Sequence, residues 1–389
     1  MAAEQPDAAS GEAREAYPFQ VADAPPKWMD PARFREIVSG KRQGVGASLI
    51  RAGLRLAAIP YAAVVGARNR LWDQGKIEIC RAAVPVVSVG NLTLGGTGKT
   101  PMVAYLARWF REQGRRVAIV SRGYGAGEDG RNDEALELEQ QLPDVPHVQN
   151  ANRVDAARVA TEELECDLVI MDDGFQHRRL HRDLDLVLID ALEPFGHGHI
   201  FPRGTLREPT SSLARADAVV LSRSDMISPR ERAALQQRVR LLAPRAIWAE
   251  VMHAPRALLS AAGQESACQE LAGRRVAAFC GLGNPAGFRH TLEQCGYEVA
   301  AWRAFADHYR YRREDVAELA NWAETAQVEA VVCTHKDLVK LSVESLGGIP
   351  LRAVAVGIEF RLGAEALAER LGEVLRMQQA AGGESAVEE

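Results

Sequence analysis

The sequence lacks several features that would place it in common classes of protein. Its net charge of −5 over 389 residues gives no general basicity, which argues against a nucleic-acid partner. Its six cysteines form no C-x-x-C pair, which favours buried, reduced thiols in a cytosolic protein. The N-terminus is polar and acidic, without the apolar core of a secretory signal. We therefore expect a cytosolic globular protein that binds no nucleic acid.

The sequence also lacks an uncharged apolar run of about 20 residues, the length that crosses a membrane. Its most apolar segment, Ala47 to Trp72, has an uncharged core of 12 residues, Leu56 to Ala67. Four arginines flank this core, namely Arg51, Arg55, Arg68 and Arg70. Such a segment is typical of a helix in the bilayer interface that faces anionic headgroups, with Pro60 expected to kink or divide it. The alternative is a helical hairpin packed on the protein's own core.

The clearest motif is a glycine-rich stretch, VGNLTLGGTGKTP, at residues 89–101. A β-branched run precedes it and an apolar-periodic segment follows it, so the local pattern predicts strand, loop and helix. This is the context of a phosphate-binding loop, whose backbone N–H groups turn toward phosphate oxygens. The expected nucleotide ligands are Thr93, Gly95, Gly96, Thr97, Gly98, Lys99 and Thr100, with Thr100 also on Mg²⁺. Thr93 stands where the usual pattern has glycine, and a glycine-rich turn that binds nothing is the alternative.

Strand and helix patterns alternate along the rest of the chain. Strands are predicted at residues 116–121, 167–171, 185–190 and 218–222, and then at 276–280, 298–302, 328–333 and 351–356. This order predicts an α/β protein with a P-loop NTPase-like, mostly parallel sheet covered by helices on both faces. The expected parts are a polar, partly disordered N-terminus (1–46), the amphipathic helical segment (47–80), the P-loop domain (81–268), a smaller α/β domain (269–377) and a disordered tail (378–389). Ligands of such sheets lie at the carboxyl ends of the strands.

Two further patterns bear on a nucleotide site. An apolar strand that ends in Asp172 and Asp173 follows the glycine-rich loop, which is typical of a Walker B motif that holds Mg²⁺. The turn from Gly281 to Ala286 has the G-x-G-x-x-A spacing of a dinucleotide site, but no acidic residue closes the next strand, so we expect a structural turn.

The residues that follow the acidic pair are more specific. DDGFQHR at 172–178, PRGTLREP at 202–209 and SRGYG at 121–125, together with VGNLTLGGTGKTP, resemble the lipid A 4′-kinases (tetraacyldisaccharide 4′-kinases) from about residue 47 to 356. The resemblance implies ATP-dependent phosphorylation of an acylated glucosamine disaccharide 1-phosphate at its 4′-hydroxyl, giving lipid IVA in lipid A and lipopolysaccharide biosynthesis. It also implies peripheral, monotopic binding at the cytoplasmic face of the inner membrane. Thr93 is usual in this family's loop, and the segment 47–72 falls at its membrane-docking helix.

The same resemblance implies roles for individual residues. Lys99 and Asp173 are expected to be catalytic, and Arg153 and Arg207 to contact phosphate. The implied Mg²⁺ ligands are Thr100, Asp172 and Glu208, while Arg122, Gln176 and His177 lie beside the site. Asp133 and His308 match the family's catalytic aspartate–histidine pair, although Asn132 replaces the glycine before that aspartate. Thr334-His335-Lys336-Asp337 matches a Thr-Glu-Lys-Asp motif in which His335 replaces the glutamate.

Three other readings remain open from the residues alone. A membrane-partitioning ATPase would carry a signature lysine where this chain has Leu94. A GTPase for metal delivery would need a guanine-reading element, which Thr334 to Asp337 resembles only loosely. A zinc site at His177 and His181 is disfavoured because Arg178 and Arg179 lie between them.

Overall fold

The computed structural model of the protein describes residues 31–123, 133–307 and 309–385, and its side chains from residue 33 to 376 within these ranges. In chain order the elements are α1 (Pro31–Val38), α2 (Val45–Asp73), β1 (Val86–Asn91), α3 (Lys99–Glu112), β2 (Val117–Ser121), α4 (Asp133–Gln141), β3 (His147–Gln149), α5 (Arg153–Arg158), β4 (Leu168–Asp172), β5 (Leu184–Asp190), β6 (Ala218–Ser222), α6 (Pro229–Leu242), β7 (Ile247–Leu259), β8 (Glu265–Ser266), β9 (Arg275–Cys280), α7 (Pro285–Gln294), β10 (Glu298–Ala304), α8 (Arg313–Ala326), β11 (Ala330–Thr334), α9 (His335–Leu341), β12 (Ser345–Leu346), β13 (Ile349–Leu362) and α10 (Ala364–Ser385). Short turns of 3₁₀ or π-helix add Val159–Glu163, Gly196–Gly198, Thr210–Arg215, Ser224–Met226 and Cys268–Leu271.

One half of the molecule, the first lobe (residues 86–242), is built on a parallel sheet. Its strands lie in the order β6-β5-β1-β4-β2-β3, and each pairs in parallel with its neighbours. Their side chains are buried over nearly the whole sheet because helices cover both faces, which is why these strands are apolar and β-branched throughout. The predicted α/β fold with a P-loop NTPase-like sheet is confirmed.

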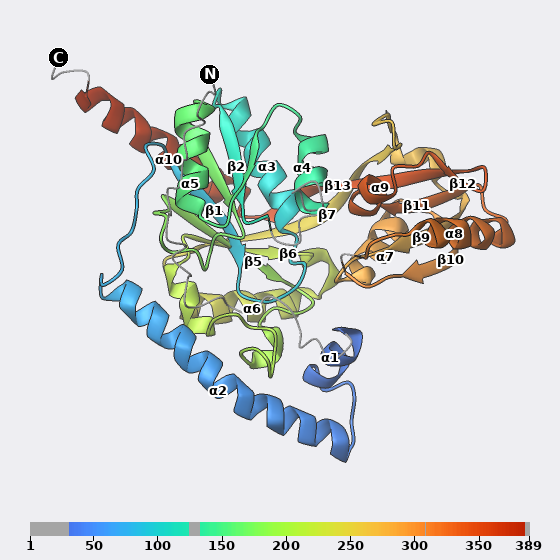
Figure 1. Cartoon of the computed structure of the whole chain (residues 1–389), viewed down its shortest axis with the longest axis horizontal. Coiled ribbons are helices and arrows are strands. Elements are labelled where there is room, and N and C mark those ends of the chain that lie inside the picture. The colour runs from blue at the N-terminus through green and yellow to red at the C-terminus, as the bar shows by residue number, and fades with distance from the viewer. Residues whose placement is uncertain (1–30, 124–132, 308, 386–389) are drawn as a thin grey trace, which may run out of the picture.

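The other half, the second lobe (residues 265–346), continues the same sheet. Strands β10, β9 and β11 pair in parallel, and β11 pairs in parallel with β13. The long strands β7 and β13 pair antiparallel and extend through both lobes, so the described residues contain one sheet of 13 strands (Figure 1). The sequence analysis predicted only residues 351–356 of this pair and no strand at β7.

Helix α2 is a single helix of 29 residues that lies along the outside of the first lobe (Figure 1). The expected division of the segment at Pro60 is therefore wrong, as is the alternative of a hairpin. The helix buries only Ala47, Leu54, Val65 and Asn69, while Val45, Leu49, Leu56, Ile59 and Val64 are exposed. By length and composition it is the one helix among the described ranges that would suffice to span a membrane, which corrects the expectation that it is too short.

The C-terminal helix α10 returns to the first lobe. It follows β13 directly, contacts β7 and adds Leu367, Leu371 and Val374 to the core beneath α3. It ends at Ser385 and so includes most of residues 378–389, the part expected to be a disordered tail.

Candidate active site

The loop between β1 and α3 has the backbone of a phosphate-binding loop. Gly95 and Gly98 adopt φ angles of 113° and 88°, which residues with a side chain rarely adopt. A Cβ at Gly98 would also lie 2.5 Å from Nε2 of His253, a half-buried residue of β7 beneath the loop. Helix α3 begins at Lys99, so its N-terminal N–H groups and positive dipole end face the loop's interior. The predicted strand, loop and helix are confirmed.

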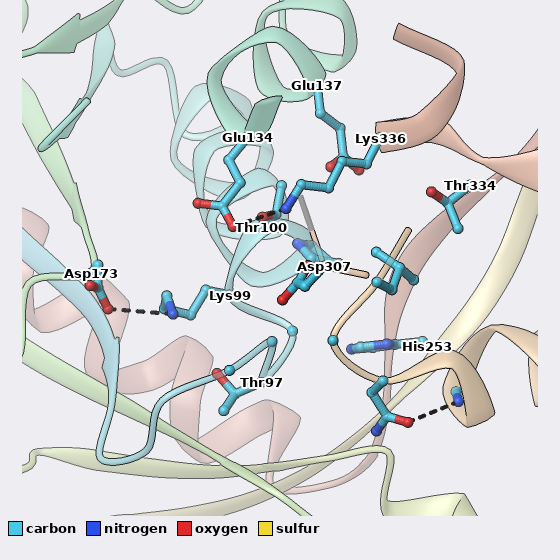
Figure 2. Close-up of a pocket in the computed structure, with 18 of the residues that line it drawn as sticks. Thr97, Lys99, Thr100, Glu134, Glu137, Asp173, His253, Asp307, Thr334 and Lys336 are labelled. Atoms are coloured by element: carbon cyan, nitrogen blue, oxygen red, sulfur yellow. Dashed lines mark hydrogen bonds and ion pairs between the residues drawn. The ribbon is translucent and has the colours of Figure 1, made fainter. Parts of the chain in front are cut away.

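This loop forms one wall of a pocket of about 510 Å³ between the two lobes. Figure 2 shows Lys99 and Asp173 on the side of the first lobe, Thr334 and Lys336 on the side of the second, and Asp307 between them. Of the residues predicted from the sequence, the pocket gathers Gly95, Gly96, Thr97, Gly98, Lys99, Thr100, Arg122, Arg153, Asp172, Asp173 and Arg207. Thr93, Asp133, Gln176, His177 and Glu208 are not part of its lining.

Lys99 is held at the mouth of the loop by two partners. Its Nζ lies 3.4 Å from Oδ1 of Asp173 and 3.3 Å from Oδ1 of Asn91. Asp173 also accepts a hydrogen bond of 2.7 Å from Nη1 of Arg207. Burial alone would raise the pKa of Asp173, but Arg207 and Lys99 outweigh it and hold that pKa below its usual range. The two cations and one carboxylate thus form a preassembled, ionised cluster beside the loop.

Asp172, the last residue of β4, has a different environment. It is 4% exposed, and its Oδ1 has no hydrogen-bond partner. Burial, reinforced by Glu134, raises the pKa of Asp172 to about 7, against the opposing effect of Lys99. A buried carboxylate oxygen without a partner at the end of a strand fits a cation ligand. Within the described residues no three histidine, cysteine or acidic side chains form a metal cluster. Mg²⁺ is an ion commonly held by one or two carboxylates together with water and phosphate.

Glu208 lies outside this pocket. Its fully buried carboxylate accepts hydrogen bonds of 2.9 Å from Asn69 of α2 and from Arg215, and Nη2 of Arg68 lies 3.7 Å away. Although burial opposes ionisation, Arg215 and the hydrogen bonds hold the pKa of Glu208 below its usual value. The structure thus places Glu208 in a buried ion cluster that attaches α2 to the first lobe.

Arg122 and Arg153 add two further basic side chains to the pocket. Arg153 is 3% exposed and donates to the backbone oxygen of Asn150, at the start of α5. His177 lies nearby, where burial and the charge of Arg153 lower its pKa to about 3 and keep the imidazole neutral. Gln176 donates to the backbone oxygen of Asn91 and accepts from Arg207, so it positions the strand and the arginine.

The predicted catalytic pair is only partly described. Asp133 begins α4, where its Oδ2 lies 2.8 Å from Nζ of Lys340 in α9. His308 falls outside the described residues. Its neighbour Asp307 lines the pocket (Figure 2).

The motif at 334–337 supports the pocket from the second lobe. Asp337 accepts hydrogen bonds from Thr334, Tyr311 and the backbone N–H of Gly281. Because these contacts occupy its carboxylate, Asp337 fixes the turn at 281–284, which lines the pocket through Leu282, Gly283 and Asn284. The turn is therefore held by Asp337 and also shapes the site.

Among the pocket residues that the sequence analysis missed are Arg223, His253 and Arg35. Arg223, with a φ of 53°, donates to Asp190 over 2.6 Å and to the backbone oxygen of Gly96 over 3.1 Å. His253 supports the loop from β7, and burial with the charge of Arg223 lowers its pKa to about 3. Arg35 enters from α1. Arg223 follows β6 directly, so the rule that ligands gather at strand ends was an available signal for it.

Together, the fold and the pocket define a P-loop nucleotide-binding enzyme with its site between two lobes. A family model described as Tetraacyldisaccharide-1-P 4′-kinase matches residues 50–376, and the chain belongs to this family. A tetraacyldisaccharide 4′-kinase from Anaeromyxobacter dehalogenans (strain 2CP-C) is 43% identical over 346 residues, which cover 84% of this chain and 91% of that protein. The tetraacyldisaccharide 4′-kinase from Geobacter metallireducens is 38% identical over 324 residues, which cover 79% of this chain and 93% of that protein.

A solved structure supports the same assignment. LpxK from Aquifex aeolicus, an "apo" form in complex with ATP, superimposes with a TM-score of 0.66 at 29% identity. The match covers 84% of this chain and 99% of that one.

Proposed function

We propose that this pocket transfers the γ-phosphate of ATP to the 4′-hydroxyl of a tetraacyldisaccharide 1-phosphate. The observation that carries the proposal is the cluster of Lys99, Asp173 and Arg207 directly beside a phosphate-binding loop. Phosphoryl transfer depends mostly on positioning and on neutralising charge, which these groups supply. The loop's N–H groups, Lys99, Arg153 and Arg207 would bind the phosphates of ATP.

The donor set also fits Mg²⁺. The hydroxyl of Thr100 and the unpartnered Oδ1 of Asp172 would hold the ion in the pocket. When bound, Mg²⁺ would offset the negative charge of the terminal phosphates. The buried position of Glu208 between two arginines favours a structural role for this residue over the predicted metal role.

The acceptor hydroxyl must lose a proton as its bond to phosphorus forms. We assign this step to Asp133 and His308, because an aspartate paired with a histidine has a proton affinity nearer neutrality than aspartate alone. In the described structure the Asp133 carboxylate pairs with Lys340. Breaking that pair would free the carboxylate to act.

Helix α2 would bring the enzyme to its lipid. Its exposed apolar residues and flanking arginines suit the surface of a bilayer with anionic headgroups. We therefore place the protein on the cytoplasmic face of the inner membrane, as a peripheral enzyme.

The test is transfer of labelled phosphate from ATP to a tetraacylated glucosamine disaccharide 1-phosphate in detergent with Mg²⁺. Wild type is compared with Lys99→Ala and, as a control, with Arg274→Ala, which removes an exposed arginine from the second lobe. We expect labelled lipid from wild type and from the control, and none from Lys99→Ala. ATP hydrolysis without labelled lipid in wild type would refute the proposal.

A further inference from the structure

Helix α1 lies before the range that the family model matches, yet it reaches the nucleotide pocket. Its Arg35 lines that pocket and donates a hydrogen bond from Nη1 to the backbone oxygen of Gly283 in the second lobe. Its Nη2 lies 4.0 Å from the position that a Cβ would take at Gly95. Arg35 therefore stands between the phosphate loop and the opposite wall.

The position of Arg35 is well anchored. Phe34, Ile37 and Val38 are buried in a small core that also contains Leu54 of α2 and Phe201 of the first lobe. Arg203 donates to the backbone oxygen of Val38 over 3.0 Å, which fixes the end of α1. Leu94 of the phosphate loop packs against the same core, so the loop and α1 share one support.

The location favours contact with phosphate. Gly95 to Lys99 form the inner rim of the loop, and Lys99 marks where the terminal phosphates lie. A guanidinium has five N–H groups, and the bond to Gly283 uses one of them. Two of the pocket arginines of the first lobe have carboxylate partners, since Arg207 pairs with Asp173 and Arg223 with Asp190. Arg35 instead is fixed through a backbone oxygen.

We propose that Arg35 is a further catalytic residue, which contacts the γ-phosphoryl group during its transfer. In this step the acceptor oxygen bonds to the γ-phosphorus as the bond to the β,γ-bridging oxygen breaks. The bridging oxygen leaves on ADP with the electron pair, and the hydroxyl proton goes to the base. Arg35 exchanges no proton and stabilises the negative charge on the transferring group, as an arginine finger does. This inference rests on the proposed function.

The proposed role of Arg35 also links phosphoryl transfer to the position of helix α2. Arg35 is positioned through a core that α2 completes with Leu54. A disturbance of α2 would therefore move the arginine relative to the loop.

The experiment compares Arg35→Ala and Arg35→Lys with wild type in the labelled-lipid assay. A contact made mainly in the transition state predicts a fall in kcat of roughly 10²–10³-fold for Arg35→Ala, with little change in either KM. Arg35→Lys keeps the positive charge but loses the planar guanidinium, which can donate two parallel hydrogen bonds to a phosphate. We therefore expect partial activity. The control is Lys41→Ala, which removes one exposed positive charge just after α1 and should retain wild-type turnover.

Binding provides a second readout, independent of turnover. Calorimetry should show wild-type affinity of Arg35→Ala for ADP with Mg²⁺, but a loss of at least about tenfold for ADP with aluminium fluoride, a mimic of the transferring phosphoryl group. An equal loss for both would show a structural role and overturn the proposal. A raised KM for the lipid with unchanged kcat would assign Arg35 to the acceptor's phosphate, and would also overturn it. If wild type labels no lipid, the proposed function fails before Arg35 is tested.

Discussion

At the scale of single residues, the buried acids of this protein have two different kinds of environment. The carboxylate of Glu208 accepts hydrogen bonds from Asn69 and Arg215, whereas Asp172 has a buried oxygen without a hydrogen-bond partner. Paired buried charges stabilise a fold only as long as both partners remain, and unpaired ones are tolerated where a ligand completes them. Substitution of Glu208 should therefore lower the free energy of unfolding, whereas substitution of Asp172 should leave it unchanged or raise it.

Replacing Glu208 with alanine should destabilise the protein by about 3–5 kcal/mol, because Arg68 and Arg215 would keep buried charges without a partner. The matched variant Asp172→Asn should leave the free energy of unfolding unchanged or raise it, yet abolish Mg²⁺-dependent phosphate transfer. Urea unfolding and the kinase assay measure the two effects. A stable Glu208→Ala protein with weakened Mg²⁺ dependence would restore the metal role of Glu208.

Glu137 of α4 should make stability depend on pH. Burial raises its pKa to about 7, with Glu134 and Asp337 adding to the shift and Lys336 opposing it. The folded protein thus keeps a proton that the unfolded chain loses above pH 4.5, so this residue's contribution to stability declines as pH rises toward 7.

Glu137→Gln should remove this decline. Relative to wild type, the variant should gain up to about 3 kcal/mol of unfolding free energy between pH 5 and pH 8, at ~1.4 kcal/mol per pKa unit. Denaturant unfolding at both pH values checks the gain. Parallel pH profiles for the two proteins would contradict it.

At the scale of elements, α2 is attached to the first lobe by a few side chains and exposes most of its apolar surface. Leu56 and Ile59 are 69% and 62% exposed. Leu241 of α6 is 80% exposed but lies on a mostly polar helix, so it offers a matched control.

Leu56→Glu combined with Ile59→Glu should weaken binding to anionic vesicles at least tenfold, because insertion of each apolar side chain is worth about 1.5–3 kcal/mol. Vesicle flotation measures this, and Leu241→Glu should bind as wild type does. Activity in detergent should be retained. Unchanged flotation of the double variant would exclude α2 as the docking element.

At the scale of the whole molecule, two of the contacts between the lobes are the pairing of strands β7 and β13 and, above the pocket, the packing of α4 against α9. At the second contact Lys336 lies 3.4 Å from Glu134 and is largely buried. Its charge compensates several acids on α4 and in the pocket, which hold the pKa of Lys336 above its usual value despite burial.

Lys336→Met should reduce the free energy of unfolding by about 3 kcal/mol, because it removes the charge that compensates the buried Glu137 and the partly buried acids around it. Hydrogen exchange should rise first in α4 and α9, with the parallel strands of the first lobe unaffected. Arg274→Ala, which breaks the exposed pair with Glu329, should cost less than about 1 kcal/mol. Equal losses in the two variants, or uniform exchange, would contradict this.

The sequence predicted the features that depend on local pattern. The loop at 89–101, the acidic end of β4 and the strand Ala218–Ser222 all follow from residue type and spacing. Features that depend on distant contacts could not be read in this way. The strand β7 contains Pro255 and charged residues that obscure its pattern, and only its partner β13 shows it to be a strand. The burial of Glu208 and the reach of Arg35 likewise depend on α2 and α1 packing against residues far along the chain.

The route of the chain between β7 and β13 determines the order in which the protein can be completed during synthesis. The second lobe is inserted between these strands, and the core of the first lobe includes Ile358, Leu367 and Val374 from beyond the insertion. A ribosome must therefore translate the whole second lobe before the apolar face beneath α3 can be covered. Until then that face is open to chaperones and to other nascent chains, so the first lobe, although it begins to emerge earlier, cannot finish folding first.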